Sequence, residues 1–225
     1  MKYRYVLFDA DETLFHFDIM AGLVHLFKQY QITFTVADFQ HYQQTNKQLW
    51  LDYQNGNISA EYLQVKRFTE WGEKLKVPAK QLNNQFLDAM GLICSLLPGA
   101  AALLTKLQAH AKLGIITNGF ARMQQIRLQH TGLEHMFDWL VISEEVGVAK
   151  PNAQIFEHTF ELMGNPPKNE ILMVGDNAAS DVLGGINAGI DTCWLQHAGQ
   201  TLPEGIKPSF KVNSLAQLAQ TLGLK

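Results

Sequence analysis

The chain has 225 residues and a formal charge of -3, from 18 Lys and Arg against 21 Asp and Glu. This length suits one large domain or a domain with an insert, and the charge offers no basic footprint for a nucleic-acid polymer. Cys94 and Cys193 form no Cys-x-x-Cys pair, so we expect buried thiols rather than a disulfide framework or a zinc site. We also expect a cytoplasmic protein with no membrane partner, since no run has the pattern of a signal peptide or a spanning helix.

The first predicted element is a buried strand at residues 5–8, and the polar run Asp9-Ala10-Asp11-Glu12-Thr13-Leu14 follows it directly. Successive strand residues point to opposite faces, so Asp9 and Asp11 would share a side if the extended backbone continued through Ala10. The alternative is a polar turn that ends the strand, because Asp and Thr are common in turns.

The next stretch, residues 18–97, carries helical patterns and no convincing strand. Thr35-Val36-Ala37-Asp38 resembles a capping box, and Asn55-Gly56 is typical of a helix end. Ser59 can cap the helix that follows. Further apolar stripes at helical spacing begin at Tyr62 and at Leu82, and we interpret them mostly as packing surface.

Beyond residue 97, short β-rich apolar runs alternate with helical patterns. Four further parallel strands are predicted at residues 113–116, 140–142, 171–174 and 192–195. Helices are predicted at residues 122–130, from Pro151 to near Gly164, and at residues 178–188 before Gly189. We interpret Gly184, Gly185 and Gly189 as packing and capping positions rather than a phosphate loop.

Strands that alternate with helices predict an α/β fold with a doubly wound parallel sheet. The long helical stretch interrupts this rhythm after the first strand, which predicts an inserted domain. We assign residues 1–15 and 98–225 to the core domain and residues 16–97 to the inserted helical domain.

Polar clusters follow four of the predicted strands, at the edge where open α/β sheets bind ligands. They are Asp9 with Asp11, Thr117-Asn118-Gly119, Lys150-Pro151, and Gly175-Asp176 continuing to Asp181. Taken singly, each has a plain interpretation as a turn, a solvated lysine or a surface charge. In this order the set resembles the four motifs of haloacid-dehalogenase-superfamily phosphatases, across residues 5–181. The resemblance implies a Rossmann-like core with an α-helical cap.

The resemblance also implies a covalent mechanism. The Asp9 carboxylate would attack phosphorus to form an aspartyl-phosphate that water later hydrolyses. Asp11 would protonate the leaving alkoxide and then deprotonate the water. The dehalogenase branch lacks an acid at this position, because a halide needs no proton, so Asp11 favours phosphoryl chemistry.

A magnesium cofactor is implied in the same way, with Mn²⁺ as a possible substitute. Mg²⁺ prefers oxygen ligands, and Asp9, Asp176 and the main-chain carbonyl of Asp11 would supply them. Asp181 would orient a metal-bound water or Lys150. The groups that would hold the substrate phosphate are those of Lys150, Thr117 and Asn118.

Longer stretches narrow the resemblance to bacterial pyrimidine 5′-nucleotidases. They lie at residues 8–11, 49–56, 115–120 and 141–151. This resemblance implies a small-molecule nucleotide substrate such as dUMP, dTMP or UMP, and house-cleaning of non-canonical pyrimidine nucleotides. A phosphatase of sugar phosphates or phosphoglycolate is the nearest alternative, and a catalytically silent phosphate-binding or interaction protein is another. The sequence leaves open a monomer or a homodimer.

One polar residue stands out in the expected cap. Asn46 interrupts an apolar stripe that includes Trp50, so an amide could pair with a base edge while an aromatic ring stacks on the base. The alternative is that Asn46 bonds to a neighbouring backbone group and the aromatic residues are core.

Overall fold

The computed structural model describes residues 1–224, which form two compact units. Unit 1 comprises Met1–His16, Ser95–Asn118 and the described residues from Thr131 onward. Unit 2 comprises Phe17–Cys94 and Gly119–His130, so it includes a second segment that lies outside the expected range of residues 16–97. Among residues 1–224, no helix combines the length and the apolar character needed to cross a membrane.

Unit 1 is built on a six-stranded parallel sheet with the strand order β5-β4-β1-β6-β7-β8. Its strands are β1 (Tyr5–Phe8), β4 (Lys112–Thr117), β5 (Trp139–Ile142), β6 (Ile171–Gly175), β7 (Asp191–Leu195) and β8 (Phe210–Val212). At the centre, Phe8 pairs with Ile115 on one side and with Val174 on the other. The strand order reverses around β1, which places the topological switch point at the carboxyl end of this strand. The five predicted strands are confirmed.

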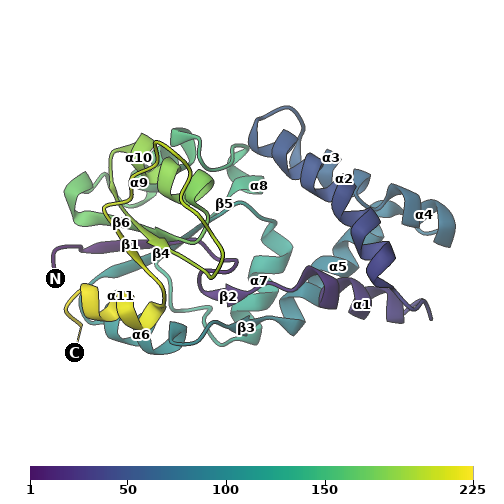
Figure 1. The fold of residues 1–225 in the computed structure, drawn as a ribbon, viewed down its shortest axis with the longest axis horizontal. Coiled ribbons are helices and arrows are strands. Elements are labelled where there is room, and N and C mark those ends of the chain that lie inside the picture. Colours follow the sequence, from purple (N-terminus) through teal and green to yellow (C-terminus); the bar gives the residue numbers. More distant parts are fainter. Residues whose placement is uncertain (225) are drawn as a thin grey trace. The chain divides into compact units, whose positions relative to one another are not determined.

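Helices cover both faces of this sheet, with α9 and α10 on one face and α6 and α11 on the other (Figure 1). The helices of unit 1 are α6 (Ala100–Gln108), α8 (Ser143–Val146), α9 (Ala153–Leu162), α10 (Leu183–Ala188) and α11 (Leu215–Thr221). A buried cluster joins Leu7 and Ile116 of the sheet to Phe156 of α9. The doubly wound α/β fold predicted from the sequence is confirmed.

Several details differ from the predictions. Residues 95 and 96 form a short antiparallel ribbon, β3 (Ser95–Leu96), with β2 (Phe15–His16), so the expectation of no strand up to residue 97 was wrong there. Neither this ribbon nor β8 is long enough to show the two-residue alternation that marks a strand in sequence. Helix α9 begins at Ala153 rather than Pro151, because the Asn152 side chain caps it.

The helix predicted at residues 178–188 is present, but its first part is a π-helix. This segment, Ala178–Val182, runs directly into α10. The glycines have the predicted packing and capping roles: a Cβ on Gly184 would come within 2.6 Å of Phe156, and Gly189 ends α10 with φ near 76°. These observations confirm that the glycines serve the fold.

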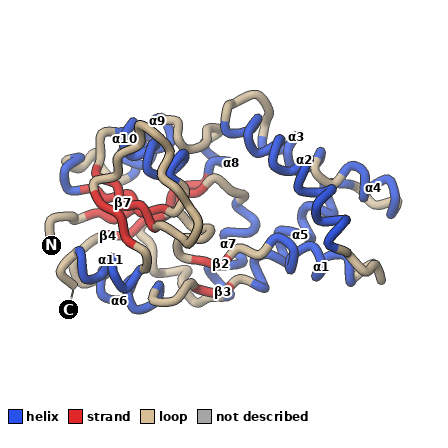
Figure 2. Tube along the Cα trace, viewed as in Figure 1, coloured by secondary structure: helices blue, strands red, loops and turns tan. Residues whose placement is uncertain are grey.

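In unit 2, all elements among the described residues are helices (Figure 2). They are α1 (Ile19–Lys28), α2 (Val36–Gln54), α3 (Ala60–Lys66), α4 (Thr69–Leu75), α5 (Ala79–Ile93) and α7 (Ala121–His130). The capping box is confirmed, since Thr35 and Asp38 each accept a hydrogen bond from the other's main-chain N–H. Ser59 caps α3 as predicted. The stripe that begins at Tyr62 is divided between α3 and α4, so Phe68 is buried whereas Tyr62 is exposed.

Helix α7 packs against α5 although it follows a strand of unit 1 in the chain. A Cβ on Gly91 would lie 2.6 Å from Cγ2 of Ile126, so the two helices approach closely at a glycine. The Arg122 guanidinium donates to both carboxylate oxygens of Asp88, at 2.5 and 2.8 Å. The helix directly after β4 is therefore part of unit 2.

Candidate active site

Asp9 stands at the end of β1, at the switch point of the sheet. Its main-chain N–H donates to the carbonyl of Val174 at 2.8 Å, and the residue is 8% exposed. The chain then turns, because Leu14 donates to the carbonyl of Ala10 at 3.0 Å and Glu12 adopts a left-handed φ of 54°. The run that contains Asp9 and Asp11 is thus both a turn and a source of carboxylates, so the two interpretations do not exclude each other.

Two further carboxylates lie beside Asp9. Asp9, Asp176 and Asp181 each offer an oxygen, and these oxygens lie within 4.8 Å of one another. A Cβ on Gly175 would collide with the Asp181 carboxylate, so the glycine at the end of β6 lets Asp181 reach the site. Asp176 is held through its main-chain N–H, which donates to the Thr13 hydroxyl at 3.0 Å.

The Lys150 ammonium lies among these groups with 1% of its residue surface exposed. It contacts Asp9 Oδ1 at 2.6 Å, Asp181 Oδ1 at 2.7 Å and the carbonyl oxygen of Ile116 at 2.6 Å. An ammonium has three N–H donors, so these contacts occupy all of them. The predicted contact between Lys150 and a phosphate would require one of these bonds to be exchanged.

Thr117 and Asn118 follow at the end of β4. Thr117 is 1% exposed. The Asn118 side chain donates to the Lys150 carbonyl at 2.8 Å and accepts from the Lys150 main-chain N–H at 2.7 Å. In this structure, the Asn118 amide therefore fixes the backbone that carries Lys150.

The site carries more negative than positive charge. Burial lowers the pKa of Lys150, but the carboxylates of Asp181 and Asp9 outweigh it, and the net pKa is raised, so the ammonium stays charged. Burial, reinforced by the charges of Asp9 and Asp181, raises the pKa of Asp176 to about 8. Burial also raises the pKa of Asp181, against the opposing effect of Lys150. Three clustered carboxylates with one ammonium fit a divalent cation that prefers oxygen ligands.

The two cap residues singled out in the sequence line a cavity of about 530 Å³ within unit 2, together with Phe17 and Lys47. Asn46 is 4% exposed, and its Oδ1 accepts from the Tyr42 hydroxyl at 3.4 Å. The partner of Asn46 is thus a side chain, not a neighbouring backbone group. The Trp50 ring lies 5.4 Å from the ring of Phe120, centroid to centroid.

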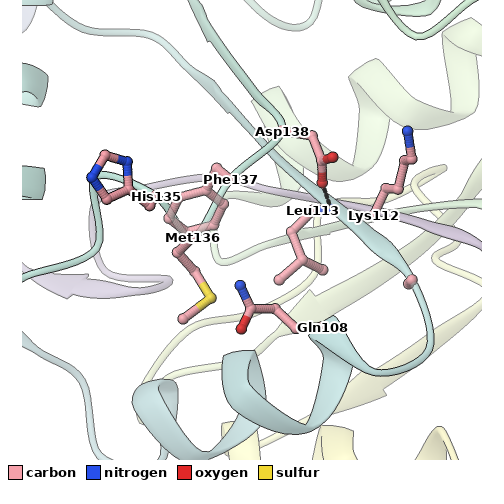
Figure 3. A pocket seen from close by; sticks show the side chains of 8 residues that line it. Gln108, Lys112, Leu113, His135, Met136, Phe137 and Asp138 are labelled. Atoms are coloured by element: carbon pink, nitrogen blue, oxygen red, sulfur yellow. Dashed lines mark hydrogen bonds between the residues drawn. The ribbon is translucent and has the colours of Figure 1, made fainter.

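Another cavity, of about 410 Å³, lies at the amino end of β4 (Figure 3). Lys112, His135 and Met136 line it, and the Asp138 carboxylate accepts from the main-chain N–H of Leu113 at 3.0 Å. Thr117 is at the other end of the same strand. This cavity is therefore separate from the carboxylate cluster.

The sequence did not reveal several residues that contact the acidic site or the turn after Asp9. The Trp194 indole N–H donates to the Asp176 carbonyl at 2.7 Å, and His197 Nε2 lies 2.6 Å from the Glu12 carbonyl oxygen. Thr13 belongs to the first polar run, so its motif position was a usable signal. Trp194 and His197 lie in or after the last strand that was predicted, where no pattern marks them.

Comparison with known proteins gives consistent matches. The family model of haloacid dehalogenase-like hydrolases matches residues 3–189. Pyrimidine 5′-nucleotidase YjjG of Escherichia coli K12 is 55% identical over 222 residues, which cover 99% of each chain. Pyrimidine 5′-nucleotidase PynA of Streptococcus pneumoniae R6 is 32% identical over 230 residues, covering 99% of this chain and 96% of that protein. The crystal structure of the HAD-hydrolase YfnB of Bacillus subtilis, bound to magnesium, gives a TM-score of 0.84 at 28% identity and 99% coverage of both chains.

Proposed function

The chain belongs to the haloacid dehalogenase-like hydrolases, and we propose that it is a magnesium-dependent pyrimidine 5′-nucleotidase. The observation that carries this proposal is the buried cluster of Asp9, Lys150, Asp176 and Asp181 at the switch point of the sheet. It occurs in a chain that is 55% identical, over nearly its full length, to a protein with that activity in its name.

Asp9 acts as the nucleophile in this proposal. One of its carboxylate oxygens forms a bond to phosphorus while the bond from phosphorus to the nucleoside 5′-oxygen breaks. Lys150 contacts Oδ1 of Asp9 at 2.6 Å, which supports this role because it fixes the orientation of the carboxylate. Asp11 gives a proton to the leaving oxygen. It then takes a proton from the water that attacks phosphorus, while the bond from phosphorus to the Asp9 oxygen breaks and inorganic phosphate leaves.

Asp9, Asp176 and the main-chain carbonyl of Asp11 would hold Mg²⁺, while Asp181 contacts Lys150. When bound, the cation supplies positive charge that offsets the repulsion between an anionic nucleophile and an anionic phosphate. Burial and the charges of Asp9 and Asp181 raise the pKa of Asp176 to about 8, and a bound cation would offset these charges and favour the ionised carboxylate. Mn²⁺ accepts similar oxygen ligands and would serve as a substitute.

For the substrate, we assign the phosphate to Thr117, Asn118 and Lys150 and the base to Asn46 and Trp50. Within residues 1–224, the Asn46 amide nitrogen donates to no other residue, and Asn46 lines the cavity of unit 2. An amide offers a donor beside an acceptor, which complements the O4 and N3–H edge of uracil or thymine. The Trp50 ring, on the same cavity, would stack on the base.

A phosphatase assay with Mg²⁺ tests the function directly. The substrates are dUMP, dTMP, UMP, the matching purine nucleotides, sugar phosphates and phosphoglycolate. We expect hydrolysis that depends on the metal and favours the pyrimidine nucleotides. An equal or higher rate with sugar phosphates would overturn the nucleotidase assignment and keep the phosphatase, whereas no hydrolysis of any ester would indicate a silent binding protein.

Two variants test the proposed nucleophile and the proposed base recognition separately. Asp9→Asn should abolish turnover of every substrate. Asn46→Ala should lower kcat/KM for dUMP more than for a sugar phosphate, and unchanged relative rates would remove Asn46 from base recognition.

The expectations of a cytoplasmic enzyme and of a monomer or homodimer belong to the same proposal, and light scattering would decide the oligomeric state.

A further inference from the structure

The segment after β7, residues 196–200, folds back on the acidic site. We propose that His197 and Gln200 are positioning residues that hold the turn carrying Asp11 and the carboxylate of Asp176. This inference rests on the roles proposed above for those two aspartates. It adds two residues that neither the polar motifs nor the comparisons assign.

His197 holds the turn that carries Asp11. Its Nε2 lies 2.6 Å from the carbonyl oxygen of Glu12, the residue directly after Asp11. A carbonyl can only accept a hydrogen bond, so Nε2 must carry the proton and donate. Glu12 has φ near 54°, a conformation that non-glycine residues rarely adopt, and an added bond to its carbonyl helps to retain it.

Gln200 links His197 to Asp176. Its Oε1 accepts from the main-chain N–H of His197 at 2.9 Å, while its Nε2 donates to Asp176 Oδ2 at 3.5 Å, a long bond. The Gln200 side chain thus connects His197, which holds the turn after Asp11, to the carboxylate of Asp176. The Trp194 indole holds the Asp176 main chain from the same strand and loop, so side chain and backbone are both anchored.

The 196–200 segment is anchored to the sheet at Gln196 and is closed by a bond between its two ends. The main-chain N–H of Gln196 donates to the Val212 carbonyl at 2.8 Å, and its side-chain amide donates to the Gln200 carbonyl at 2.8 Å. Because this segment is anchored to the sheet, the bond from His197 to Glu12 restrains the turn after β1. A side chain on such a support holds a reacting group more firmly than one on a free loop.

The test compares His197→Gln with His197→Asn. The glutamine amide reaches about as far as Nε2, whereas the asparagine amide is too short, and both variants stay polar. We expect His197→Asn to lower kcat for a nucleotide by about 10- to 100-fold with little change in KM, since small misplacements of reacting groups cost this much. His197→Gln should recover most of kcat. The matched control is His158→Asn, at an exposed position of α9, with no expected change.

Gln200 is tested by calorimetric titration of the metal-free protein with Mg²⁺. We expect Gln200→Leu to weaken binding by about 10-fold, the lower end for a residue that orients a metal ligand, and Gln154→Leu to leave it unchanged. Equal kcat values for His197→Gln and His197→Asn, or unchanged Mg²⁺ affinity in Gln200→Leu, would overturn the corresponding role. If the wild type hydrolyses no ester, the proposed function fails, while the titration still tests Gln200.

Discussion

Asp176 and Lys150 show how opposite charges share one small buried volume. The Lys150 ammonium contacts the carboxylates of Asp9 and Asp181, while the pKa of Asp176 is raised to about 8. Removing one member of such a buried ion pair is destabilising, because the charge that remains is buried away from solvent and has no partner. This arrangement is compatible with the Mg²⁺ that we propose beside Asp9 and Asp176.

The stability of the metal-free protein should depend on this residue. The pKa of Asp176 is about 8 in the folded protein against 3.8 ordinarily, so the folded state binds the proton more tightly. The resulting stabilisation is complete below pH 3.8 and is lost as the pH rises to about 8. From pH 5 to pH 8, we expect the wild type to lose about 4 kcal/mol more unfolding free energy than Asp176→Asn, since the interval covers three pH units below the folded pKa. Urea denaturation at both pH values measures the difference, and parallel losses in the two proteins would contradict it.

Asp11→Asn should separate the two chemical steps. A nucleoside leaving group needs a proton, so we expect kcat for dUMP to fall by about 10²- to 10⁴-fold. The nitrophenolate of p-nitrophenyl phosphate leaves without one, so its first step should be slowed far less. Rapid mixing should then show a burst of nitrophenolate followed by slow turnover, because the water still lacks its base. Equal loss with both esters and no burst would argue against Asp11 as the acid and base.

Among the elements, α2 starts at a capping box that the sequence predicts. Thr35→Ala removes the side-chain acceptor for the Asp38 N–H, and we expect a loss of about 1 kcal/mol of unfolding free energy. The variant should retain kcat, because Thr35 is outside the proposed site. Thr105→Ala in α6, where the hydroxyl donates to the Ala101 carbonyl, is the matched control and should be closer to neutral. Equal losses would mean that capping is not the cause.

The elements also show why some features were predictable and others were not. The capping box and the strands of the central sheet are encoded by local spacing, so their residues were found from sequence. The break between α3 and α4 and the pairing of β2 with β3 depend on contacts between distant segments. Local patterns do not contain that information, so the stripe that begins at Tyr62 did not reveal that Tyr62 itself is exposed.

At the scale of the whole molecule, the sheet topology explains the predictability of the site. Once strands are placed in parallel order, their carboxyl ends gather, and Asp9, Lys150 and Asp176 meet there. The topology does not determine the hydrogen-bond partner of each side chain at the site. Asn118 bonds to the backbone of Lys150, and His197 reaches back from a segment with no motif, both of which require the folded loops.

Unit 2 is built from two segments of the chain, so we expect that exchanging only one of them destabilises the unit. A chimera that takes residues 17–94 from a distant relative keeps Ile126 and Arg122 of this chain against a foreign α5. We expect a lower melting temperature than in a chimera that also exchanges residues 119–130, because close helix packing tolerates mismatch poorly. Differential scanning calorimetry of the two chimeras compares them, and equal melting temperatures would show that the α5–α7 contact is permissive.

The placement of α7 also limits how genes of this kind can recombine. A single crossover block covering residues 17–94 would bring in a new helical unit without the helix that completes it. A functional exchange needs a second stretch that starts one residue after Asn118. Inheritance of a new helical unit is thereby tied to inheritance of the residues that directly follow Thr117 and Asn118 in the chain.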